Sequence, residues 1–213
     1  DLEQVTLIQG ESDALGHSAV TCDVNGDGRD DLILGAPLAN ALDGRISLFL
    51  GTSDGLSSAP TLSIDGPPLA VERFGQSVAC ADIDGDGHAD LLVGAVDGNA
   101  AYQFLGRASY PGLNDASVAT LTAAGSVALG ESMALADLNG DGFVDAVIGD
   151  AAYSTFEGRV HVYLGNTDGT LPSTPSFDIQ AASPAASAEF GGQLTVGDVD
   201  TNGRADILVS GVG

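Results

Sequence analysis

Asp82-Ile-Asp-Gly-Asp-Gly-His-Ala-Asp90 decides the fold of this chain, because the same nine-residue pattern occurs four times. The other copies are Asp23-Val-Asn-Gly-Asp-Gly-Arg-Asp-Asp31, Asp137-Leu-Asn-Gly-Asp-Gly-Phe-Val-Asp145 and Asp198-Val-Asp-Thr-Asn-Gly-Arg-Ala-Asp206. Successive copies begin 59, 55 and 61 residues apart, and a glycine preceded by Leu or Phe stands seven residues before each one. Such regular spacing indicates internal repeats of one structural unit.

Short apolar runs surround each acidic segment and predict strands. The expected strands are 32–34, 44–51 and 61–64; 91–93, 99–106 and 119–122; 146–148, 158–165 and 177–179; 207–209; and, at the N-terminus, 5–8 as a counterpart of the last strand of a repeat. No segment has a sustained 3.6-residue apolar period, so we expect almost no helix. Four strands in roughly 50–60 residues is the size of a propeller blade, which predicts an all-β propeller of four-stranded antiparallel blades. The alternative, a β-sandwich, would not require an acidic loop at the same place in every unit.

The acidic segments have the side chains that a calcium site needs. Asp or Asn occupies positions 1, 3 and 5, Asp occupies position 9, and glycine at position 6 allows the turn that points the position-7 carbonyl at the ion. Calcium prefers six to eight hard oxygen ligands at about 2.3–2.6 Å. The candidate ligands are Asp23, Asn25, Asp27, Arg29 and Asp31; Asp82, Asp84, Asp86, His88 and Asp90; Asp137, Asn139, Asp141, Phe143 and Asp145; and Asp198, Asp200, Asn202, Arg204 and Asp206.

We therefore expect about four calcium ions, one per repeat, with each position-9 aspartate chelating through both oxygens. The fourth site should be the weakest, because Thr201 replaces glycine and Asn202 replaces aspartate. An EF-hand is excluded, since its position 12 is Glu whereas this chain has Leu34, Val93, Ile148 and Val209 there. Magnesium prefers smaller octahedral sites. Zinc would need ligands that the isolated histidines 17, 88 and 161 do not supply. Simple turns would not bring together several carboxylates that repel one another.

The composition restricts the partners. Thirty acidic residues against six basic ones give a formal net charge of −24, which disfavours nucleic acid and anionic membrane surfaces. No apolar run approaches the roughly 20 residues of a membrane-spanning helix. Cys22 and Cys80 lie one and two residues before their acidic segments, so strand alternation should point them to opposite faces. We interpret both as small buried residues, with a disulfide as the less favoured alternative.

The repeat resembles a known family. Phe74-Gly75, followed by Asp82-Ile-Asp-Gly-Asp-Gly and Leu91-Leu-Val-Gly-Ala95, is similar to the FG-GAP repeat of integrin α-subunit propellers and their bacterial relatives, and Gly35-Ala36-Pro37 completes the signature in the first copy. The resemblance covers residues 1–213 as one propeller segment, with repeats centred on 23–31, 82–90, 137–145 and 198–206. It implies calcium loops between the first and second strands of each blade, and adhesion or ligand binding outside the cell. The departures, such as Leu15 and Leu129 for Phe, affect the edges of the signature and not the ligands.

The number of repeats predicts an incomplete ring. The chain begins on an outermost strand, continues through three complete blades, and stops after the second strand of a fourth. Propellers of the resembled family usually have seven blades. We expect a fragment of a longer propeller, or completion by further blades or another chain, because an open last strand is an edge that invites association.

The functional interpretation is an extracellular calcium-binding module for adhesion or for binding a protein or polysaccharide ligand. The alternative is a structural subunit or spacer in a surface appendage or a multidomain secreted protein. Exposed aromatic residues would indicate a ligand face, but Tyr102, Tyr110, Tyr153 and Phe156 are more simply read as strand or turn packing. We do not expect an enzyme: the chain has no nucleophile elbow, phosphate loop or metal-hydrolase histidine pair, and His161 is expected at the surface. Calcium of sufficient concentration for such modules is found outside the cytosol.

Overall fold

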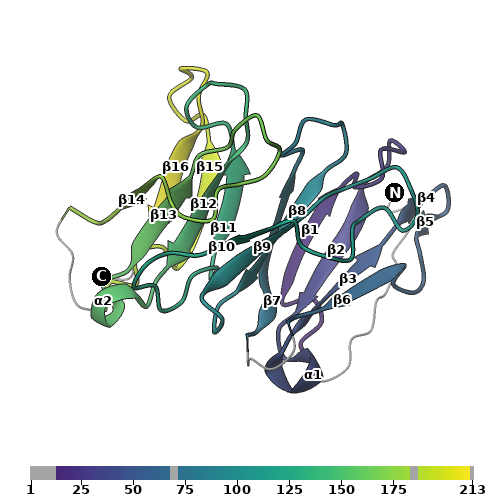
Figure 1. The fold of residues 1–213 in the computed structure, drawn as a ribbon, viewed down its shortest axis with the longest axis horizontal. Coiled ribbons are helices and arrows are strands. Elements are labelled where there is room, and N and C mark those ends of the chain that lie inside the picture. Colours follow the sequence, from purple (N-terminus) through teal and green to yellow (C-terminus); the bar gives the residue numbers. More distant parts are fainter. Residues whose placement is uncertain (1–12, 68–71, 183–186, 212–213) are drawn as a thin grey trace, which may run out of the picture.

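The computed structural model describes residues 13–67, 72–182 and 187–211, which form a row of antiparallel sheets following one another in sequence order (Figure 1). The first strands of successive sheets are neighbours in space: β1 contacts β7, β7 contacts β11, and β11 contacts β15. This is the arrangement of propeller blades around an axis. The all-β propeller expectation is therefore confirmed, and no closed ring is formed by the residues that the structure describes.

Three of the sheets have four strands each, paired in sequence order within the blade. The first contains β1 (Ser18–Cys22), β2 (Asp31–Ala36), β3 (Arg45–Phe49) and β6 (Leu62–Asp65). The second contains β7 (Phe74–Ala81), β8 (Asp90–Ala95), β9 (Ala100–Phe104) and β10 (Ala119–Leu121). The third contains β11 (Met133–Ala136), β12 (Asp145–Asp150), β13 (Arg159–Tyr163) and β14 (Phe177–Ile179).

The remaining elements are short. A fourth sheet contains β15 (Gln193–Gly197) and β16 (Asp206–Ser210), and a small hairpin contains β4 (Gly51–Thr52) and β5 (Gly55–Leu56). The helices α1 (Ala39–Leu42) and α2 (Tyr153–Phe156) are four-residue turns, in agreement with the expectation of almost no helix. The strands predicted between 32 and 209 are present, whereas the one expected at 5–8 lies outside the described residues.

The core lies between the sheets, because the second strands are buried on both faces. In β8, Leu91 and Val93 pack into a cluster with Phe74 of the first strand, whereas Leu92 faces the opposite way into a cluster with Tyr163 of the next blade. Leu91, Leu92 and Val93 have essentially no exposed surface. This explains why the triplet after each acidic segment is entirely apolar instead of alternating with polar residues.

Glycines bring neighbouring sheets into close contact. A Cβ added at Gly35 of β2 would lie 2.1 Å from the carbonyl oxygen of Gly75 in the next blade, and the Ser18 hydroxyl donates to that same oxygen (2.8 Å). The contact recurs between the second and third blades, where Gly94 meets Gly130, and between the third and fourth, where Gly149 meets Gly191. The glycines of the repeat signature thus form the close contacts between neighbouring blades. We call the pairs Gly35–Gly75, Gly94–Gly130 and Gly149–Gly191 the glycine interlock.

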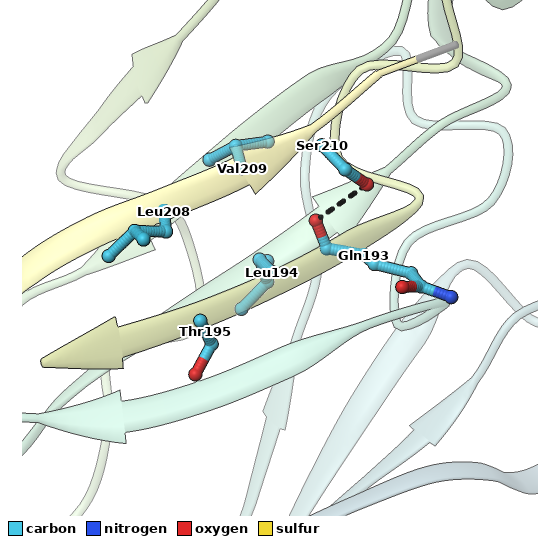
Figure 2. Close-up of a pocket in the computed structure, with 6 residues that line it drawn as sticks. All are labelled: Gln193, Leu194, Thr195, Leu208, Val209 and Ser210. Atoms are coloured by element: carbon cyan, nitrogen blue, oxygen red, sulfur yellow. Dashed lines mark hydrogen bonds between the residues drawn. The ribbon is translucent and has the colours of Figure 1, made fainter.

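The fourth sheet differs at both positions of this interlock. Ser210 stands where the earlier second strands have glycine, and Gln193 stands where the earlier first strands have serine. The Ser210 hydroxyl donates to the Gln193 carbonyl oxygen in its own sheet (3.3 Å; Figure 2). On the surrounding face, lined by Leu194, Thr195, Leu208 and Val209, Leu208 is 44% exposed.

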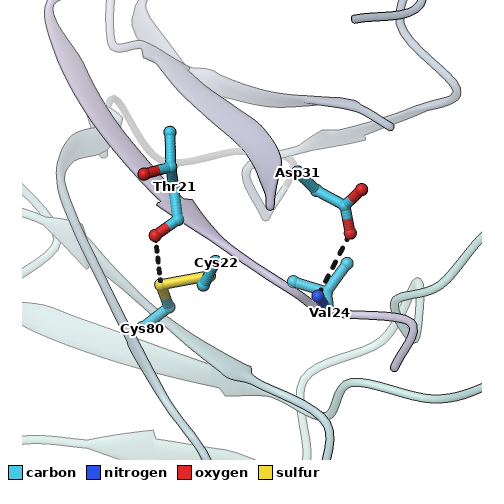
Figure 3. Close-up of a disulfide and its surroundings, with 5 residues drawn as sticks. All are labelled: Thr21, Cys22, Val24, Asp31 and Cys80. Carbon is cyan, nitrogen blue, oxygen red and sulfur yellow. Dashed lines mark hydrogen bonds between the residues drawn. A yellow bond between two sulfur atoms is a disulfide. The ribbon is translucent and has the colours of Figure 1, made fainter. Parts of the chain in front are cut away.

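Cys22 and Cys80 form a disulfide between β1 and β7, so the interpretation of two separate buried cysteines is wrong (Figure 3). Both residues are only partly buried. The alternation argument failed because it treated the two strands as members of one sheet. Neighbouring blades stack face to face, so residues that meet across the gap must lie on opposite faces of equivalent strands. The one-residue offset between the two cysteines is what this pairing requires.

Candidate metal centre

Each acidic segment connects the first and second strands of its blade, as the family resemblance implies. We call residues 23–31, 82–90, 137–145 and 198–206 loops 1 to 4. They follow β1, β7, β11 and β15 and end at the first residue of β2, β8, β12 and β16. Because the first strands of the blades are neighbours, the four loops lie at the same end of the sheets.

Backbone N–H groups hold the position-1 carboxylate in every loop. The position-6 glycine donates to one of its oxygens, at 2.7, 3.0, 2.8 and 2.8 Å in loops 1 to 4. This glycine has φ between 83° and 89°, in the left-handed region that other residues rarely adopt. In loop 3, the hydrogen bond from the Gly142 N–H lowers the pKa of Asp137, so this carboxylate is readily ionised.

Positions 3 and 5 are oriented by the same kind of contact. The position-5 N–H donates to the position-3 side-chain oxygen, at 2.9, 3.1, 2.8 and 3.0 Å in loops 1 to 4. The position-7 N–H donates to the position-5 side-chain oxygen at 2.8–2.9 Å. These are turns in which a short Asp or Asn side chain bonds to the backbone two residues ahead. The side-chain oxygens of all three odd positions therefore have defined directions.

The position-9 aspartates connect each of loops 1 to 3 to the rest of its blade. Asp31, Asp90 and Asp145 are fully buried. One oxygen of each accepts the position-2 N–H of its own loop, and the other accepts the N–H of the glycine after the third strand, which is Gly51, Gly106 or Gly165 (2.8 Å each). Burial raises the pKa of Asp90 to about 6 despite these N–H contacts.

The donor set fits a hard cation. In loop 2, one oxygen each of Asp82, Asp84 and Asp86 lie within 4.8 Å of one another, and in loop 4 the same holds for Asp198, Asp200 and Asp206. Loops 1 and 3 have Asn at position 3, whose amide oxygen is an equivalent neutral donor. The candidate side chains are oxygen donors, the ligands that calcium prefers. The structure therefore brings three of the predicted carboxylates together in loop 2 and three in loop 4.

Position-7 side chains have contacts that the sequence did not reveal. The His88 ring of loop 2 lies against Gly26 of loop 1, where an added Cβ would be 2.9 Å from the ring, and Arg204 of loop 4 lies against Gly140 of loop 3. The Ala89 N–H also donates to the Asp23 carbonyl oxygen (2.9 Å). Neighbouring loops thus touch in pairs. The sequence feature that could have indicated these contacts is the glycine at position 4, which has φ of 70° to 79° in loops 1 to 3.

Thr201 takes the place of this glycine in loop 4 and adopts φ 62°. A left-handed conformation costs a non-glycine residue about 1–2 kcal/mol. Loop 4 therefore has a local conformational cost that loops 1 to 3, with glycine at this position, do not have.

The four aromatic candidates fall into two groups. Tyr102 and Tyr153 are partly buried: the Tyr102 hydroxyl donates to Glu72 (2.9 Å), and the Arg159 guanidinium lies 3.7 Å from the centre of the Tyr153 ring. Tyr110 and Phe156 are 78% and 52% exposed, so the packing interpretation is wrong for these two. Tyr110 borders a pocket of about 260 Å³ that Asn25 and Asp27 of loop 1 also line.

His161 is another correction. Its side chain is 1% exposed, not at the surface, because Asp178 of β14 and Asp150 of β12 flank it on either side of β13. Two residues of the sequence could have indicated that His161 is buried. Asp150 stands at the alanine position of the Gly-Ala-Pro signature, and Asp178 pairs in register with His161, so three polar substitutions coincide in one blade.

Comparisons with known proteins agree with the repeat architecture. The family described as FG-GAP-like repeat matches residues 23–93 and 137–209. Similar proteins include integrin alpha-V of Gallus gallus (31% identical, covering 93% of this chain and 20% of the relative) and integrin alpha-IIb of Homo sapiens (34%, 99% and 16%). Phosphatidylinositol-glycan-specific phospholipase D of Rattus norvegicus is 31% identical, covering 72% of this chain and 20% of the relative.

The chain spans a fifth or less of the length of these relatives. Among the described residues, none of the helices has the length and apolar character needed to cross a membrane. The two matched ranges include all four acidic loops and extend over more than half of the chain. The chain belongs to the FG-GAP repeat family, as an integrin-α-like propeller segment.

Proposed function

We propose that this chain is a calcium-binding propeller segment of an extracellular protein that acts in adhesion or in binding a protein ligand. The observation that carries the proposal is the repeated geometry of the loops. In each loop the same backbone N–H groups orient the oxygens of positions 1, 3 and 5, which are the donors that a calcium ion would use. We propose one ion per loop, held by the residues named above.

Calcium would remove the cost of placing these carboxylates together. In loop 2, one oxygen each of Asp82, Asp84 and Asp86 lie within 4.8 Å of one another, and the His88 Nδ1 lies 2.8 Å from Asp86. Like charges at such distances repel strongly. A divalent ion reverses the sign of that interaction and joins the turn between the first two strands of each blade.

The Cys22–Cys80 disulfide supports the extracellular assignment, because disulfides persist in oxidising compartments. The family resemblance supports adhesion or ligand binding, and nothing in the comparisons supports a polysaccharide ligand. We propose a binding role and not catalysis for this segment, although one relative is named as a phospholipase. Exposed Tyr110, beside loop 1, is the aromatic residue best placed to contact a ligand.

Calcium titration of the intact chain tests the proposal. After treatment with chelator, isothermal calorimetry should detect up to four sites, and the melting temperature should rise with free calcium, because a ligand that binds only the folded state stabilises it. The variant D82N/D84N/D86N should lose one site. The matched control is D115N, which removes an exposed carboxylate outside the loops and should leave the number of sites unchanged.

A melting temperature that is the same in chelator and in millimolar calcium, with no heat of binding, would show that the acidic segments are only turns. The same number of sites in D82N/D84N/D86N and D115N would contradict the assignment of loop 2.

A further inference from the structure

The third blade contains a cluster of three ionisable side chains, two of them buried, that the metal loops do not use. We define the His161 cluster as Asp150, His161 and Asp178. The His161 Nδ1 lies 2.7 Å from Asp178 Oδ1, its Nε2 lies 3.8 Å from Asp150 Oδ2, and Asp150 is fully buried. The equivalent strand position in the first blade is Ser47, which pairs with the hydroxyl of Ser63 (3.3 Å). The first blade therefore has a neutral pair where the third has a histidine and an aspartate.

Asp150 holds the segment that leads into the first strand of its blade. Its two oxygens accept the N–H groups of Val127 (3.2 Å) and Ala128 (2.9 Å). Ala128 directly precedes Leu129-Gly130, the third copy of the Phe-Gly pair. The carboxylate thus fixes the entry of the chain into the third blade.

In the second and fourth blades a backbone carbonyl of the preceding blade does this. The Arg73 N–H donates to Leu42 (2.9 Å), and the Glu189 N–H donates to Phe156 (2.8 Å). Leu42 and Phe156 end the left-handed turns α1 and α2, with φ of 81° and 63°. The corresponding loop of the second blade, residues 96–99, is four residues shorter than loops 37–44 and 151–158 and has no such turn. Asp150 supplies the acceptor that this short loop lacks.

A buried carboxylate requires compensation, and His161, whose Nε2 lies 3.8 Å from Asp150, is a side chain that can supply a positive charge when both ring nitrogens are protonated. The other cation nearby, Arg159, pairs with Asp178 (3.0 Å) and stacks on Tyr153, so it does not serve Asp150. The His161 ring also contacts the edge of Tyr153, with 6.5 Å between centroids. Two further titratable groups, the Glu131 carboxyl and the Tyr163 phenol, lie close enough to interact electrostatically with Asp150. Burial alone would raise the pKa of Asp150, but polar contacts from His161 and Ser126 and the Val127 and Ala128 N–H groups outweigh it and lower the pKa.

We propose that His161 is a proton-dependent latch at the junction of the second and third blades. With both ring nitrogens protonated it faces a carboxylate on each side, keeps Asp150 ionised, and so holds residues 127–128 in place. In the neutral ring, one nitrogen loses its proton and the attraction to a buried carboxylate ends. The junction is therefore tighter at low pH and looser as the pH rises through the range in which histidines titrate, about pH 5 to 8.

Hydrogen exchange of the amides of 127 and 128 measures the latch directly. In the intact chain with constant calcium, their protection, corrected for intrinsic exchange, should fall by about tenfold between pH 5 and 8, the size of one charge-assisted contact. H161Q should make the protection independent of pH. H17Q is the matched control, because it removes an exposed histidine and should leave the dependence intact. The amide of Arg73, which uses a backbone acceptor, is the internal reference.

Flat protection in the unaltered chain, or a pH dependence that persists in H161Q, would overturn the proposal. If H161Q does not fold, the nitrogen chemical shifts of His161 in the unaltered chain decide the matter. A ring that loses a proton between pH 5 and 8 together with the protection supports the latch, and a ring that stays neutral throughout refutes it. Neither result depends on whether the loops bind calcium.

Discussion

Gly94→Ala tests whether the glycine interlock holds neighbouring blades together. A Cβ at this position would lie 2.2 Å from the Gly130 carbonyl oxygen and 2.4 Å from the Ser77 hydroxyl. Carbon and oxygen pack at about 3.3–3.6 Å, so the second and third sheets would have to separate by about 1 Å. Such overpacking costs about 1–3 kcal/mol. The displaced Ser77–Gly130 hydrogen bond, now 2.6 Å, adds about 0.5–1.5 kcal/mol.

The expected total is a loss of about 2–4 kcal/mol, or roughly 5–15 °C in melting temperature for a chain of this size. Urea unfolding and thermal melts at constant calcium measure it. Gly197→Ala is the matched control: its Cβ would have no neighbour within 4 Å, and the change should be neutral or stabilising by about 0.4–1 kcal/mol. If the two variants unfold alike, the close contact between Gly94 and Gly130 does not stabilise the packing of the second blade on the third.

Two further predictions concern the disulfide and one ion pair. The double variant C22S/C80S removes a cross-link between residues 58 apart and should lower stability by about 2–4 kcal/mol, and a reducing agent should have the same effect on the unaltered chain but none on the variant. Arg45 Nε donates to Asp65 Oδ1 (2.6 Å) and lowers the pKa of this aspartate, so the contact stabilises the fold above the ordinary pKa of 3.8 and its contribution disappears as the pH falls below that value. Since Asp65 is half exposed, R45Q should cost only about 0.5 kcal/mol near neutral pH and nothing near about pH 2, which acid and urea unfolding of both proteins would show.

The parts of this protein that were predictable from its sequence are those that repeat. The acidic loops are local: Asp82, Gly87 and Asp90 lie within nine residues, and the turn that brings them together depends on their spacing alone. The strands around them followed from the apolar triplets, because β8 is buried on both faces by its two neighbours. Comparison among four copies separated constant positions from variable ones, which a single copy would not have allowed.

The features that were missed depend on how one blade faces the next. The Cys22–Cys80 bond requires knowing that equivalent strands meet across opposite faces, which no pattern within one blade contains. His161 was misplaced because its strand position is occupied by Ser47 and Tyr102 elsewhere, which suggested tolerance of any polar residue. Its burial follows from Asp150 and Asp178 on the two adjacent strands, and only the coincidence of all three substitutions carries that information.

The position-9 aspartates show why the loops are part of the blade framework and not appendages to it. Asp90 begins the second strand, accepts the Ile83 N–H of its own loop, and accepts the Gly106 N–H after the third strand. Any ion held by loop 2 would therefore be connected through one buried side chain to three strands of the blade. Because the His88 ring also rests on Gly26, the same loop contacts loop 1 of the preceding blade. A cation at this position would order both the second blade and its contact with the first blade. Removing calcium with a chelator should therefore lower the free energy of unfolding by more than the loss of four independent turns would.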